Sequence, residues 1–367
     1  MDFSVGVVGT GLMGVAHTNA LRWNGIHVAG VLGSSEEKSR KFADEYQISR
    51  IYHSFEQMLE DTKLDVIHLT TPNHLHYPHA KAALLAGKHV ACEKPLTMTA
   101  KESRELLQIA REKQLVTAVN FNFRMYEMVE KARMMVLNGA IGNPYFIHGS
   151  YLQDWLLYAT DWNWRLNPKF GGRLRTVGDI GSHWIDLVSY ICGVRVVEVM
   201  ADFKTIHPHR VIDGNQKFAI DTEDYATIMM HFENGGSGVV TLSQMCSGHK
   251  NRIFFEINAS QSSLAWNGEK ADELWIGHRD KPNEYLYPEN EKKTRDSKGE
   301  KVAFPVTFNE LYRRVYQYLD AGNYQKTPDF PTFHDGHYGM LVLEAIEKSY
   351  HQKAWVQVNL GELNGSN

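Results

Sequence analysis

One short glycine-rich segment constrains the fold of this chain more than any other feature. Gly9-Thr10-Gly11-Leu12-Met13-Gly14 follows an apolar run at residues 5–8 and opens a helical pattern that reaches about Trp23. With this spacing the first glycine permits a tight turn, the second lets a pyrophosphate approach the backbone, and the third lets helix and strand pack closely. The segment predicts a dinucleotide-binding βαβ unit in which residues 9–14 contact the cofactor at a helix N-terminus. The alternative is a glycine-rich turn without a ligand.

The rest of the first third alternates short apolar runs with helical patterns, which is typical of βαβ units around a buried parallel sheet. Strands are expected at residues 5–8, 27–32, 66–70, 89–92 and 116–119. Helices are expected between them, at residues 36–46, 77–86 and 100–113. The pattern predicts an α/β fold with an N-terminal doubly wound parallel sheet, of the Rossmann type, over residues 1–121.

After residue 121 the pattern changes to alternating strands joined by turn-like connections. A helix at 127–138 precedes expected strands at 144–152, 196–204, 225–232, 238–245, 252–259 and 274–276, and late helices follow at 309–320 and 336–351. The polar stretch 278–301 is expected to be a solvated loop. We predict a C-terminal α+β domain over residues 122–367, built on a large, mostly antiparallel sheet.

Composition and charge exclude several classes of protein and site. The 367 residues are 43% hydrophobic, and Lys+Arg 39 against Asp+Glu 43 leaves a formal net charge of −4 without a block of like charges, so no nucleic-acid partner is expected. The three cysteines have no C-x-x-C spacing, and the histidine pairs 74/76 and 207/209 lack further ligands, so no disulfide framework and no metal site are expected. Without a signal-peptide pattern or a long apolar segment, we expect a soluble, cytoplasmic protein with no membrane partner.

The end of the second expected strand bears on the choice of nucleotide. NAD-binding proteins often carry Asp or Glu there to accept from the ribose hydroxyls, whereas this chain reads Leu32-Gly33-Ser34-Ser35. Ser34 and Ser35 can donate to a 2′-phosphate, and Lys38 or Arg40 can neutralise it. The segment therefore favours NADP over NAD. The alternative is that the serines only cap the following helix, and NAD can also be held without a carboxylate.

Two further segments follow the ends of later parallel strands, where ligands bind in open α/β sheets. The expected cofactor contacts there are Thr71, Pro72, Asn73, His76, Glu93 and Lys94. Lys94 can hydrogen-bond a substrate hydroxyl, and a nearby oxidised nicotinamide would lower its pKa by like-charge repulsion. The alternative for Lys94 is an ordinary surface charge.

In the second domain, Gly171-Gly172-Arg173 leads into a segment with Asp179 and His183. The four-residue spacing places both side chains on one face if the turn is helical. A carboxylate beside an imidazole can orient it and stabilise its charge after proton abstraction. The alternative is a surface ion pair without a catalytic role.

Together these motifs resemble a known family. Gly9-x-Gly11-x-x-Gly14, Pro72-Asn73-x-x-His76, Glu93-Lys94-Pro95 and Gly171-Gly172 with Asp179-Ile180-Gly181-Ser182-His183 are similar to the Gfo/Idh/MocA family of glucose-fructose oxidoreductase, inositol dehydrogenase and rhizopine-catabolism proteins. The resemblance implies that Lys94, Asp179 and His183 surround a reacting carbinol, with His183 accepting the proton, and that Pro95 is cis. It also implies sugar or polyol substrates and a homo-oligomer, a dimer or tetramer, formed through the C-terminal sheet. Arg173, where many members have a third glycine, and the missing second-strand acid depart from the pattern.

Substrate contacts are expected from residues that can hydrogen-bond a sugar or stack on its apolar face. Besides Lys94, Asp179 and His183, they are Arg124, Tyr126, Trp155, Trp162, Arg165 and His337; the alternative for each tryptophan is packing. The expected activity is NAD(P)-dependent hydride transfer between a nicotinamide cofactor and a secondary carbinol or ketone of a sugar or polyol. A glycosidase that keeps its NAD bound and uses transient oxidation, and a non-catalytic dinucleotide sensor, stay open as alternatives.

Overall fold

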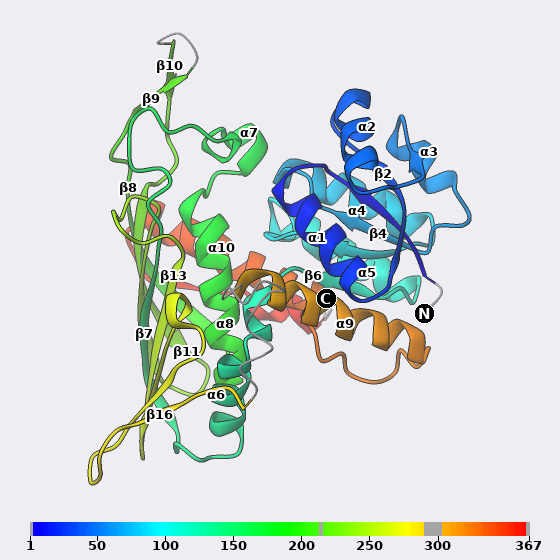
Figure 1. Ribbon diagram of the computed structural model, residues 1–367. Coiled ribbons are helices and arrows are strands. Elements are labelled where there is room, and N and C mark those ends of the chain that lie inside the picture. The colour runs from blue at the N-terminus through cyan, green and yellow to red at the C-terminus, as the bar shows by residue number, and fades with distance from the viewer. Residues whose placement is uncertain (1–2, 213–215, 290–302, 365–367) are drawn as a thin grey trace. The chain divides into compact units, whose positions relative to one another are not determined.

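The computed structural model describes residues 3–212, 216–289 and 303–364 (Figure 1). The chain divides into two compact units, one of residues 1–122 with 302–340, and one of residues 123–301 with 341–367. The second domain was predicted to comprise all of 122–367, whereas residues 302–340 group with the first unit. The physical reason lies in α9 (Ala303–Ala321), which packs on α1 (Leu12–Trp23), with Asn24 Nδ2 donating to Asn309 O at 2.9 Å.

The first unit is built on a six-stranded parallel sheet in the order β3-β2-β1-β4-β5-β6. The order reverses between β1 and β4, and ligands bind beyond the carboxyl ends of the strands at such a point. The strands are β1 (Ser4–Val8), β2 (His27–Leu32), β3 (Arg50–Ile51), β4 (Val66–Leu69), β5 (His89–Cys92) and β6 (Thr117–Val119). Both faces are covered by helices, so β1, β4, β5 and β6 are mostly apolar and buried, whereas β2 and β3, toward one edge, carry exposed residues. The predicted doubly wound sheet is confirmed, with β3 as a two-residue strand that the sequence analysis missed.

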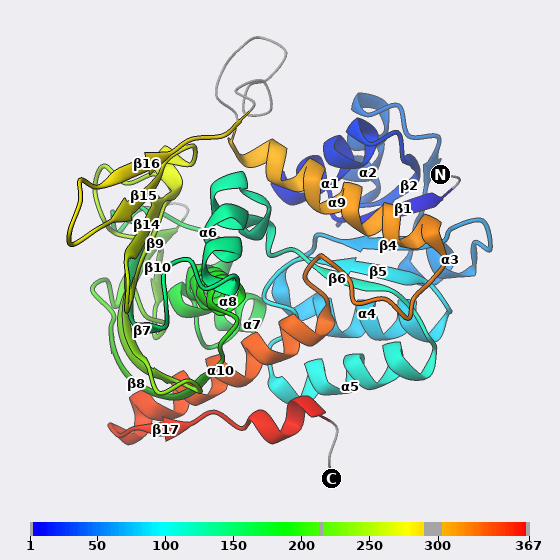
Figure 2. The same ribbon diagram turned by 90° about the horizontal axis from the view of Figure 1, so that it is seen from below.

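Helix starts in the first unit follow capping signals in the sequence. Ser35 and Ser54 accept from the backbone N–H three residues on, and Thr99 forms a capping box with Glu102. The helices are α1, α2 (Glu36–Glu45), α3 (Phe55–Glu60), α4 (His76–Leu85), α5 (Ala100–Glu112), α9 and the first part of α10 (Phe333–Gln352). Helix α9 runs beside α1 in Figure 2.

The second unit is built on a nine-stranded sheet in the order β16-β15-β14-β13-β7-β12-β11-β8-β17. Only β7 and β12 pair in parallel among these neighbours, which confirms the predicted large, mostly antiparallel sheet. The strands are β7 (Pro144–Leu152), β8 (Val196–Lys204), β11 (Tyr225–Phe232), β12 (Ser237–Ser243), β13 (Arg252–Ala259), β14 (Ser263–Asn267), β15 (Leu274–Gly277), β16 (Glu284–Leu286) and β17 (Val356–Gln357).

Helices cover one face of this sheet. Buried residues alternate with more exposed ones along strands such as β11 and β13, as expected when only one face is covered. Helices α6 (Glu127–Leu137), α8 (Ser182–Cys192) and the rest of α10 lie on the same side of the strands (Figure 1). Trp184 of α8 donates from Nε1 to the Phe254 carbonyl of β13 at 2.8 Å.

Smaller elements of the unit are α7 (Pro168–Gly171) and a two-stranded sheet of β9 (His209–Ile212) and β10 (Gln216–Ala219). Of the expected loop 278–301, residues 284–286 form β16, and residues 290–301 lie outside the described part of the chain. Within the described ranges, no helix combines the length and apolarity that a membrane crossing requires.

Candidate active site

The turn after β1 has the geometry that a bound pyrophosphate requires. Gly9 has a φ of +111°, and a Cβ added there would lie 2.5 Å from Thr70 Oγ1. A Cβ on Gly14 would lie 2.2 Å from the Gly9 carbonyl oxygen, so α1 packs against the turn only because both positions are glycine. A Cβ on Gly11, in contrast, would meet nothing within 4 Å. The second glycine of the motif thus borders open space at a helix N-terminus, where a phosphate would fit.

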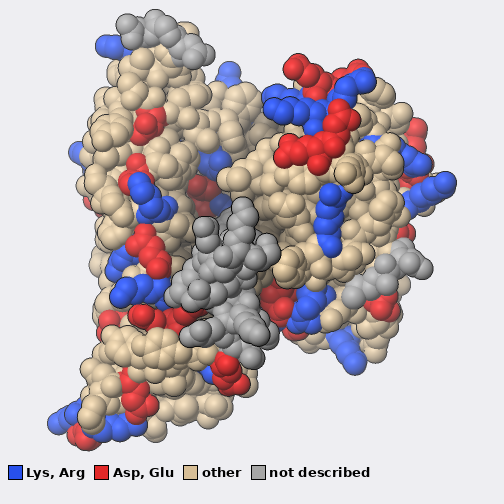
Figure 3. Space-filling model, viewed as in Figure 1, with Lys and Arg blue, Asp and Glu red and all other residues tan. Residues whose placement is uncertain are grey.

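The segment after β2 combines a helix cap with an exposed cationic group. Ser35 Oγ accepts from the Lys38 N–H at 3.3 Å, so the serine does cap α2. The Lys38 ammonium donates to Ser34 Oγ at 3.1 Å, and both side chains are exposed. Arg40 instead pairs with Glu36 at 2.7 Å. In Figure 3 acidic and basic side chains are intermixed over α2 on the face shown.

The loop after β4 is tied to its neighbours by two polar side chains. Thr70 donates from Oγ1 to the Val8 carbonyl at 2.9 Å, which joins the ends of β4 and β1. His76 is fully buried, with Nδ1 2.8 Å from the Pro95 carbonyl oxygen and Nε2 2.8 Å from that of Thr71. Burial lowers the pKa of His76, while the two carbonyl groups raise it. His76 thus joins the loop after β4 to the loop after β5.

Glu93, at the end of β5, forms its hydrogen bonds within the first unit. Oε1 accepts from His17 Nε2 at 3.1 Å and from the Asn120 amide, and Oε2 accepts from the Lys94 N–H at 3.2 Å. Burial alone would raise the pKa of Glu93, but the hydrogen bonds and charges of His17, Lys94 and Asn120 lower it to about 2. Glu93 is therefore an ionised support for the backbone at Lys94, whose peptide bond to Pro95 is cis as the resemblance implies.

A buried network of histidines and tyrosines continues behind Glu93. His17 Nδ1 lies 3.0 Å from His68 Nδ1, and His68 Nε2 lies 2.9 Å from Tyr316 Oη. Tyr312 Oη lies 2.9 Å from His17 Nε2. Burial and the neighbouring His17 hold the pKa of His68 well below its usual range. The sequence analysis missed this network because a histidine on an apolar helix face gives no signal of its partners.

Two polar atoms at the strand ends of the first unit have no hydrogen-bond partner within the described part of the chain. They are Thr71 Oγ1, after β4, and Asn120 Oδ1, after β6. Buried polar atoms are rarely left without a partner in a native protein. Together with the open space at Gly11, they fit a site that a polar ligand completes.

Asp179 and His183 lie on one continuous helical segment of the second unit. Residues Val177–Gly181 form a π-helical turn that runs directly into α8, which begins at Ser182. Asp179 accepts from Gln244 Nε2 at 2.8 Å on Oδ2 and pairs with Arg165 Nε at 3.2 Å on Oδ1. The His183 ring packs edge-on against Phe123, with ring centroids 4.8 Å apart. Such π-turns often mark functional sites because they change how side chains project.

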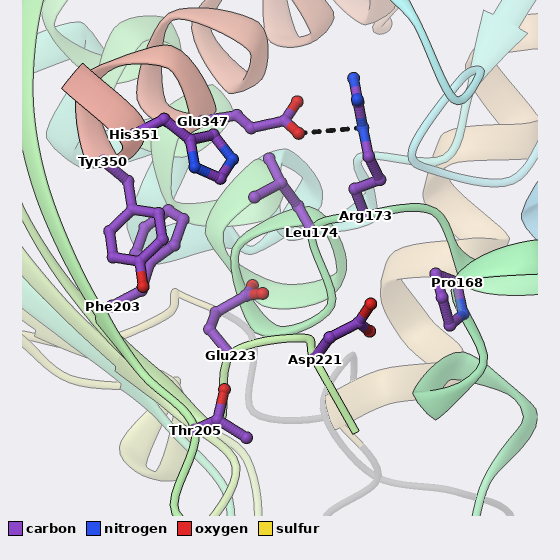
Figure 4. Close-up of a pocket in the computed structure, with 10 residues that line it drawn as sticks. All are labelled: Pro168, Arg173, Leu174, Phe203, Thr205, Asp221, Glu223, Glu347, Tyr350 and His351. Atoms are coloured by element: carbon purple, nitrogen blue, oxygen red, sulfur yellow. Dashed lines mark ion pairs between the residues drawn. The ribbon is translucent and has the colours of Figure 1, made fainter. Parts of the chain in front are cut away.

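Glu223 holds the backbone just before this turn. Its Oε1 accepts from the Val177 N–H at 2.8 Å and its Oε2 from the Arg175 N–H at 3.1 Å. Burial raises the pKa of Glu223. Glu223 also lines a pocket of about 260 Å³ together with exposed Arg173 and half-buried Glu347, which meet in an ion pair at 2.9 Å (Figure 4). Arg173 stands at the position where the family often has a third glycine. Its side chain pairs with Glu347 of α10 and extends away from the loop at residues 171–173.

The aromatic and basic residues expected to bind substrate fall into two groups. Trp155 donates from Nε1 to Gln153 Oε1 at 2.7 Å, and the same oxygen accepts from Gln244 Nε2 at 3.2 Å. Because Gln244 also binds Asp179, Trp155 is linked to Asp179 through two glutamines. Arg165 contacts Asp179 directly. The other residues contact structural partners. The rings of Trp162 and Tyr126 pack on Phe218 and Trp266, respectively. Arg124 donates a hydrogen bond to Asp186, and His337 is hydrogen-bonded to Ser103. The first group is joined to Asp179, directly or through hydrogen bonds, and the second group supports the surrounding elements. Gln153 and Gln244 were not anticipated from the sequence.

Comparison with known proteins identifies the family. Residues 3–121 match the oxidoreductase family with an NAD-binding Rossmann fold, and residues 129–265 match the GFO/IDH/MocA C-terminal domain. The chain belongs to the Gfo/Idh/MocA oxidoreductases. The resemblance drawn from the motifs is thereby confirmed.

Some individual relatives extend over nearly the whole chain, and others over about half of it. Levoglucosan dehydrogenase of Pseudarthrobacter phenanthrenivorans is 29% identical over 97% of this chain and 98% of its own length. A solved levoglucosan dehydrogenase in complex with NADH and L-sorbose has a TM-score of 0.90 and 27% identity, and covers 99% of this chain and 100% of the other. The NADP(+)-dependent scyllo-inositol 2-dehydrogenase IolW of Bacillus subtilis is 31% identical over 52% of each chain.

Proposed function

We propose that this oxidoreductase is an NAD(P)-dependent dehydrogenase that acts on a secondary carbinol, or in reverse on the ketone, of a sugar or polyol. The observation that carries the proposal is the hydrogen-bond network of Asp179, on the helical segment that also carries His183. Arg165 and Gln244 contact the carboxylate directly, and Gln153 and Trp155 extend the network beyond Gln244. A hydroxyl-rich substrate needs donors, acceptors and a flat apolar face in one place. The nucleotide turn of the first unit supplies the second requirement of the reaction, a place for the dinucleotide.

The proposed roles follow from the chemistry of each group. When bound, the nicotinamide dinucleotide supplies the hydride acceptor or donor. His183 accepts the proton of the substrate hydroxyl, which as general base catalysis contributes about 10²- to 10⁴-fold. Ionised Asp179 orients the imidazole and stabilises its positive charge. Lys94 donates to the same substrate oxygen, and its backbone is supported by Glu93.

The nucleotide is held, in this proposal, by the turn at residues 9–14 and by groups at the strand ends. Thr71, Pro72, Asn73, His76, Glu93 and Lys94 stay predicted contacts, and Thr71 Oγ1 and Asn120 Oδ1 are the atoms that a ligand would satisfy. We further propose a preference for NADP, supported by Ser34 Oγ and the Lys38 ammonium, which lie 3.1 Å apart after β2. Relatives are divided, since one is named for NADP(+) and another was solved with NADH.

The substrate is proposed to be a cyclic sugar or anhydrosugar. Levoglucosan dehydrogenase takes its name from such a compound, and its structure holds L-sorbose. In this chain Arg165 and Trp155 supply the cation and the aromatic face that the ring would contact. The residues Arg124, Tyr126, Trp162 and His337 contact structural partners, so we propose smaller or indirect roles for them.

The open face of the large sheet is the proposed surface for a homo-oligomer. It carries partly exposed apolar side chains, among them Phe146, Tyr225 and Met229, and exposed apolar patches of this kind often mark association sites. Light scattering after size exclusion would distinguish monomer, dimer and tetramer. A charged residue in place of Met229 should dissociate the oligomer. A wild-type protein that is monomeric in this measurement would contradict this part of the proposal.

The unpaired Cys92, Cys192 and Cys246 suit a reducing compartment, which is why we propose a cytoplasmic location.

A sugar and polyol panel with NAD⁺ and NADP⁺ tests the proposed activity. Reduced-nicotinamide absorbance should appear with at least one substrate and collapse in His183→Ala, while an exposed control such as His351→Ala should keep wild-type turnover. Wild-type turnover in His183→Ala would refute the assigned mechanism. Cleavage of chromogenic glycosides without net cofactor reduction would favour the glycosidase alternative, and cofactor binding without any turnover would favour the sensor.

A further inference from the structure

Gln244 occupies a buried position between Asp179 and a cluster of fixed charges. It follows β12 directly and is 0% exposed. Its Nε2 donates to Asp179 Oδ2 at 2.8 Å and to Gln153 Oε1 at 3.2 Å, and its Oε1 accepts from Arg175 Nη1 at 2.8 Å. One side chain therefore joins the candidate catalytic carboxylate to a buried guanidinium.

The chemistry of Arg175 fixes the orientation of the Gln244 amide. A guanidinium can only donate hydrogen bonds, so the amide oxygen has to face Arg175. The amide nitrogen must then face Asp179 and Gln153, both of which present acceptor atoms. The reverse orientation would set donor against donor at Arg175 and acceptor against acceptor at Asp179.

The guanidinium is itself held by buried charges. Arg175 Nη2 donates to Asp224 Oδ1, and the same oxygen accepts from Arg210 Nη2 at 2.8 Å. All three side chains are fully buried. Burial lowers the pKa of Arg175, while Asp224 and Glu223 raise it, and guanidinium groups are charged near neutral pH. The orientation of Gln244 therefore does not depend on a group that titrates near neutral pH.

The same logic extends through Gln153. Its Oε1 accepts from Gln244 and from Trp155 Nε1, so its Nε2 must donate, and it does so to Asn251 Oδ1 at 2.9 Å. Asn251 Oδ1 also accepts from Tyr151 Oη at 2.6 Å. One buried cation thus sets the direction of a chain of hydrogen bonds that reaches both Asp179 and Trp155.

We propose that Gln244 is a positioning residue that keeps Asp179 an ionised acceptor in one orientation and couples Asp179 to Trp155. Donors to a carboxylate favour its charged form. Arg165 is a second donor, but its side chain is 26% exposed and also lies over the Trp164 ring, so the buried amide is the better shielded of the two. The proposal rests on the catalytic role of Asp179 proposed above.

Two substitutions separate the donor function of Gln244 from its packing. In Gln244→Glu the new carboxylate can still accept from Arg175, but it faces Asp179 with a second negative charge, and two such groups share a proton. In Gln244→Met the shape is kept and only the donor and acceptor are lost. Gln352→Glu, exposed at the end of α10, makes the same charge change away from the site.

The primary measurement is the titration of the Asp179 carboxyl, followed by NMR in protein labelled at the aspartate Cγ and assigned by comparison with Asp179→Asn. The titration midpoint should rise in the order wild type, Gln244→Met, Gln244→Glu, by about one pH unit or more in the last, and stay unchanged in Gln352→Glu. Equal midpoints in wild type and both Gln244 variants would overturn the proposal. Because Gln244→Met adds no buried charge, it keeps the test valid if Gln244→Glu fails to fold.

Turnover gives a second and independent measurement. With an active substrate, kcat of Gln244→Glu should fall about tenfold at neutral pH and recover at higher pH as the acid limb of the profile moves upward, whereas kcat of Gln244→Met should fall without such recovery. Wild-type profiles in both variants contradict the proposal. If the wild type oxidises no compound of the panel, the proposed function fails, while the carboxyl titration still decides the role of Gln244.

Discussion

Each unit of this protein places a buried polar network behind a candidate catalytic group, but the two networks use different chemistry. In the first unit Glu93, beside Lys94, is bound by His17 and Asn120, with His68 and two tyrosines behind. In the second unit Gln244, beside Asp179, is bound by Arg175, with Asp224 and Arg210 behind. The first consists largely of a carboxylate, imidazoles and phenols, whose charge depends on their surroundings, and the second is anchored by guanidinium groups, which are charged near neutral pH.

This difference predicts how each site responds to pH. Imidazole groups change charge between about pH 5 and 8 unless their environment shifts them, so the support of Lys94 depends on a balance of burial and neighbouring charge. Guanidinium groups stay charged, so the support of Asp179 is permanent.

The largest expected effect comes from removing the shared carboxylate of the second unit. Asp224→Asn leaves the buried charges of Arg175 and Arg210 without an anion, and breaking a buried ion pair in this way costs about 3–5 kcal/mol. We expect the free energy of unfolding, measured by denaturant titration, to fall by this amount equally at pH 6 and pH 8. The exposed Asp202→Asn, on β8, serves as the control. If the loss of unfolding free energy in Asp224→Asn differed strongly between pH 6 and pH 8, the second unit would be as dependent on pH as the first, contrary to this prediction.

Glu93→Gln should give the next largest effect, with a pH dependence that Asp224→Asn lacks. Lowering the pKa of Glu93 from its usual 4.5 to about 2 corresponds to roughly 3 kcal/mol. Because the folded-state pKa is the lower one, this stability is present above about pH 4.5 and is lost as the pH falls toward 2. The difference in unfolding free energy between wild type and Glu93→Gln should therefore narrow below pH 4.5. A constant difference down to pH 3, or the same narrowing in the exposed control Glu112→Gln, would contradict the assignment.

Tyr151→Phe tests the far end of the fixed network and should have a smaller effect. The substitution removes one buried hydrogen bond to Asn251 Oδ1 but leaves Gln153 as a second donor there. We expect a loss of about 1 kcal/mol in unfolding free energy, as for a single hydrogen bond. Burial raises the pKa of Tyr151 well above its usual range, so the loss should not vary between pH 6 and 9. A loss several times larger would show that the network is more strongly coupled than its pairwise contacts indicate.

Lys38→Ala should have the smallest effect on stability and a selective effect on cofactor binding. The ammonium is exposed and donates to Ser34 Oγ, and such surface contacts contribute little to folding. Thermal unfolding should not change measurably, while affinity for NADP should fall about tenfold and affinity for NAD should be unaffected. Equal changes for both cofactors would contradict the proposed preference, and Lys41→Ala on the same helix provides the control.

Regular elements were predictable where the chain carries a clear period or a capping signal. Strands at 144–152, 196–204, 225–232 and 252–259 have the expected bounds, and the alternation of buried and more exposed residues is clearest in the last two. Strands β3 and β17 have two residues each, and β9 and β10 pair only with each other, so none has a pattern long enough to predict. The grouping of residues 302–340 with the first unit also escaped prediction, because helix patterns do not state which sheet they cover.

The residues of the candidate site also fall into those that a local pattern predicts and those that it does not. Asp179 and His183 could be predicted as site residues because their spacing is local, and the glycines at 9, 11 and 14 because a turn demands them; their roles stay predictions. Gln244 stands 65 residues from Asp179 along the chain, and His17 stands 76 residues from Glu93. No local pattern marks which glutamine or histidine will be buried against a charge.

The sequence by itself determined the local geometry: the nucleotide turn, the helix caps, the period of the strands and the motifs that identify the family. These depend on backbone sterics and on hydrogen bonds between near neighbours, which a short segment contains in full. Only the tertiary structure decided which charges are buried together and which way each buried amide points. That outcome depends on the removal of water from groups far apart in the chain, because an unsatisfied charge or donor becomes costly only once the surrounding residues have excluded solvent.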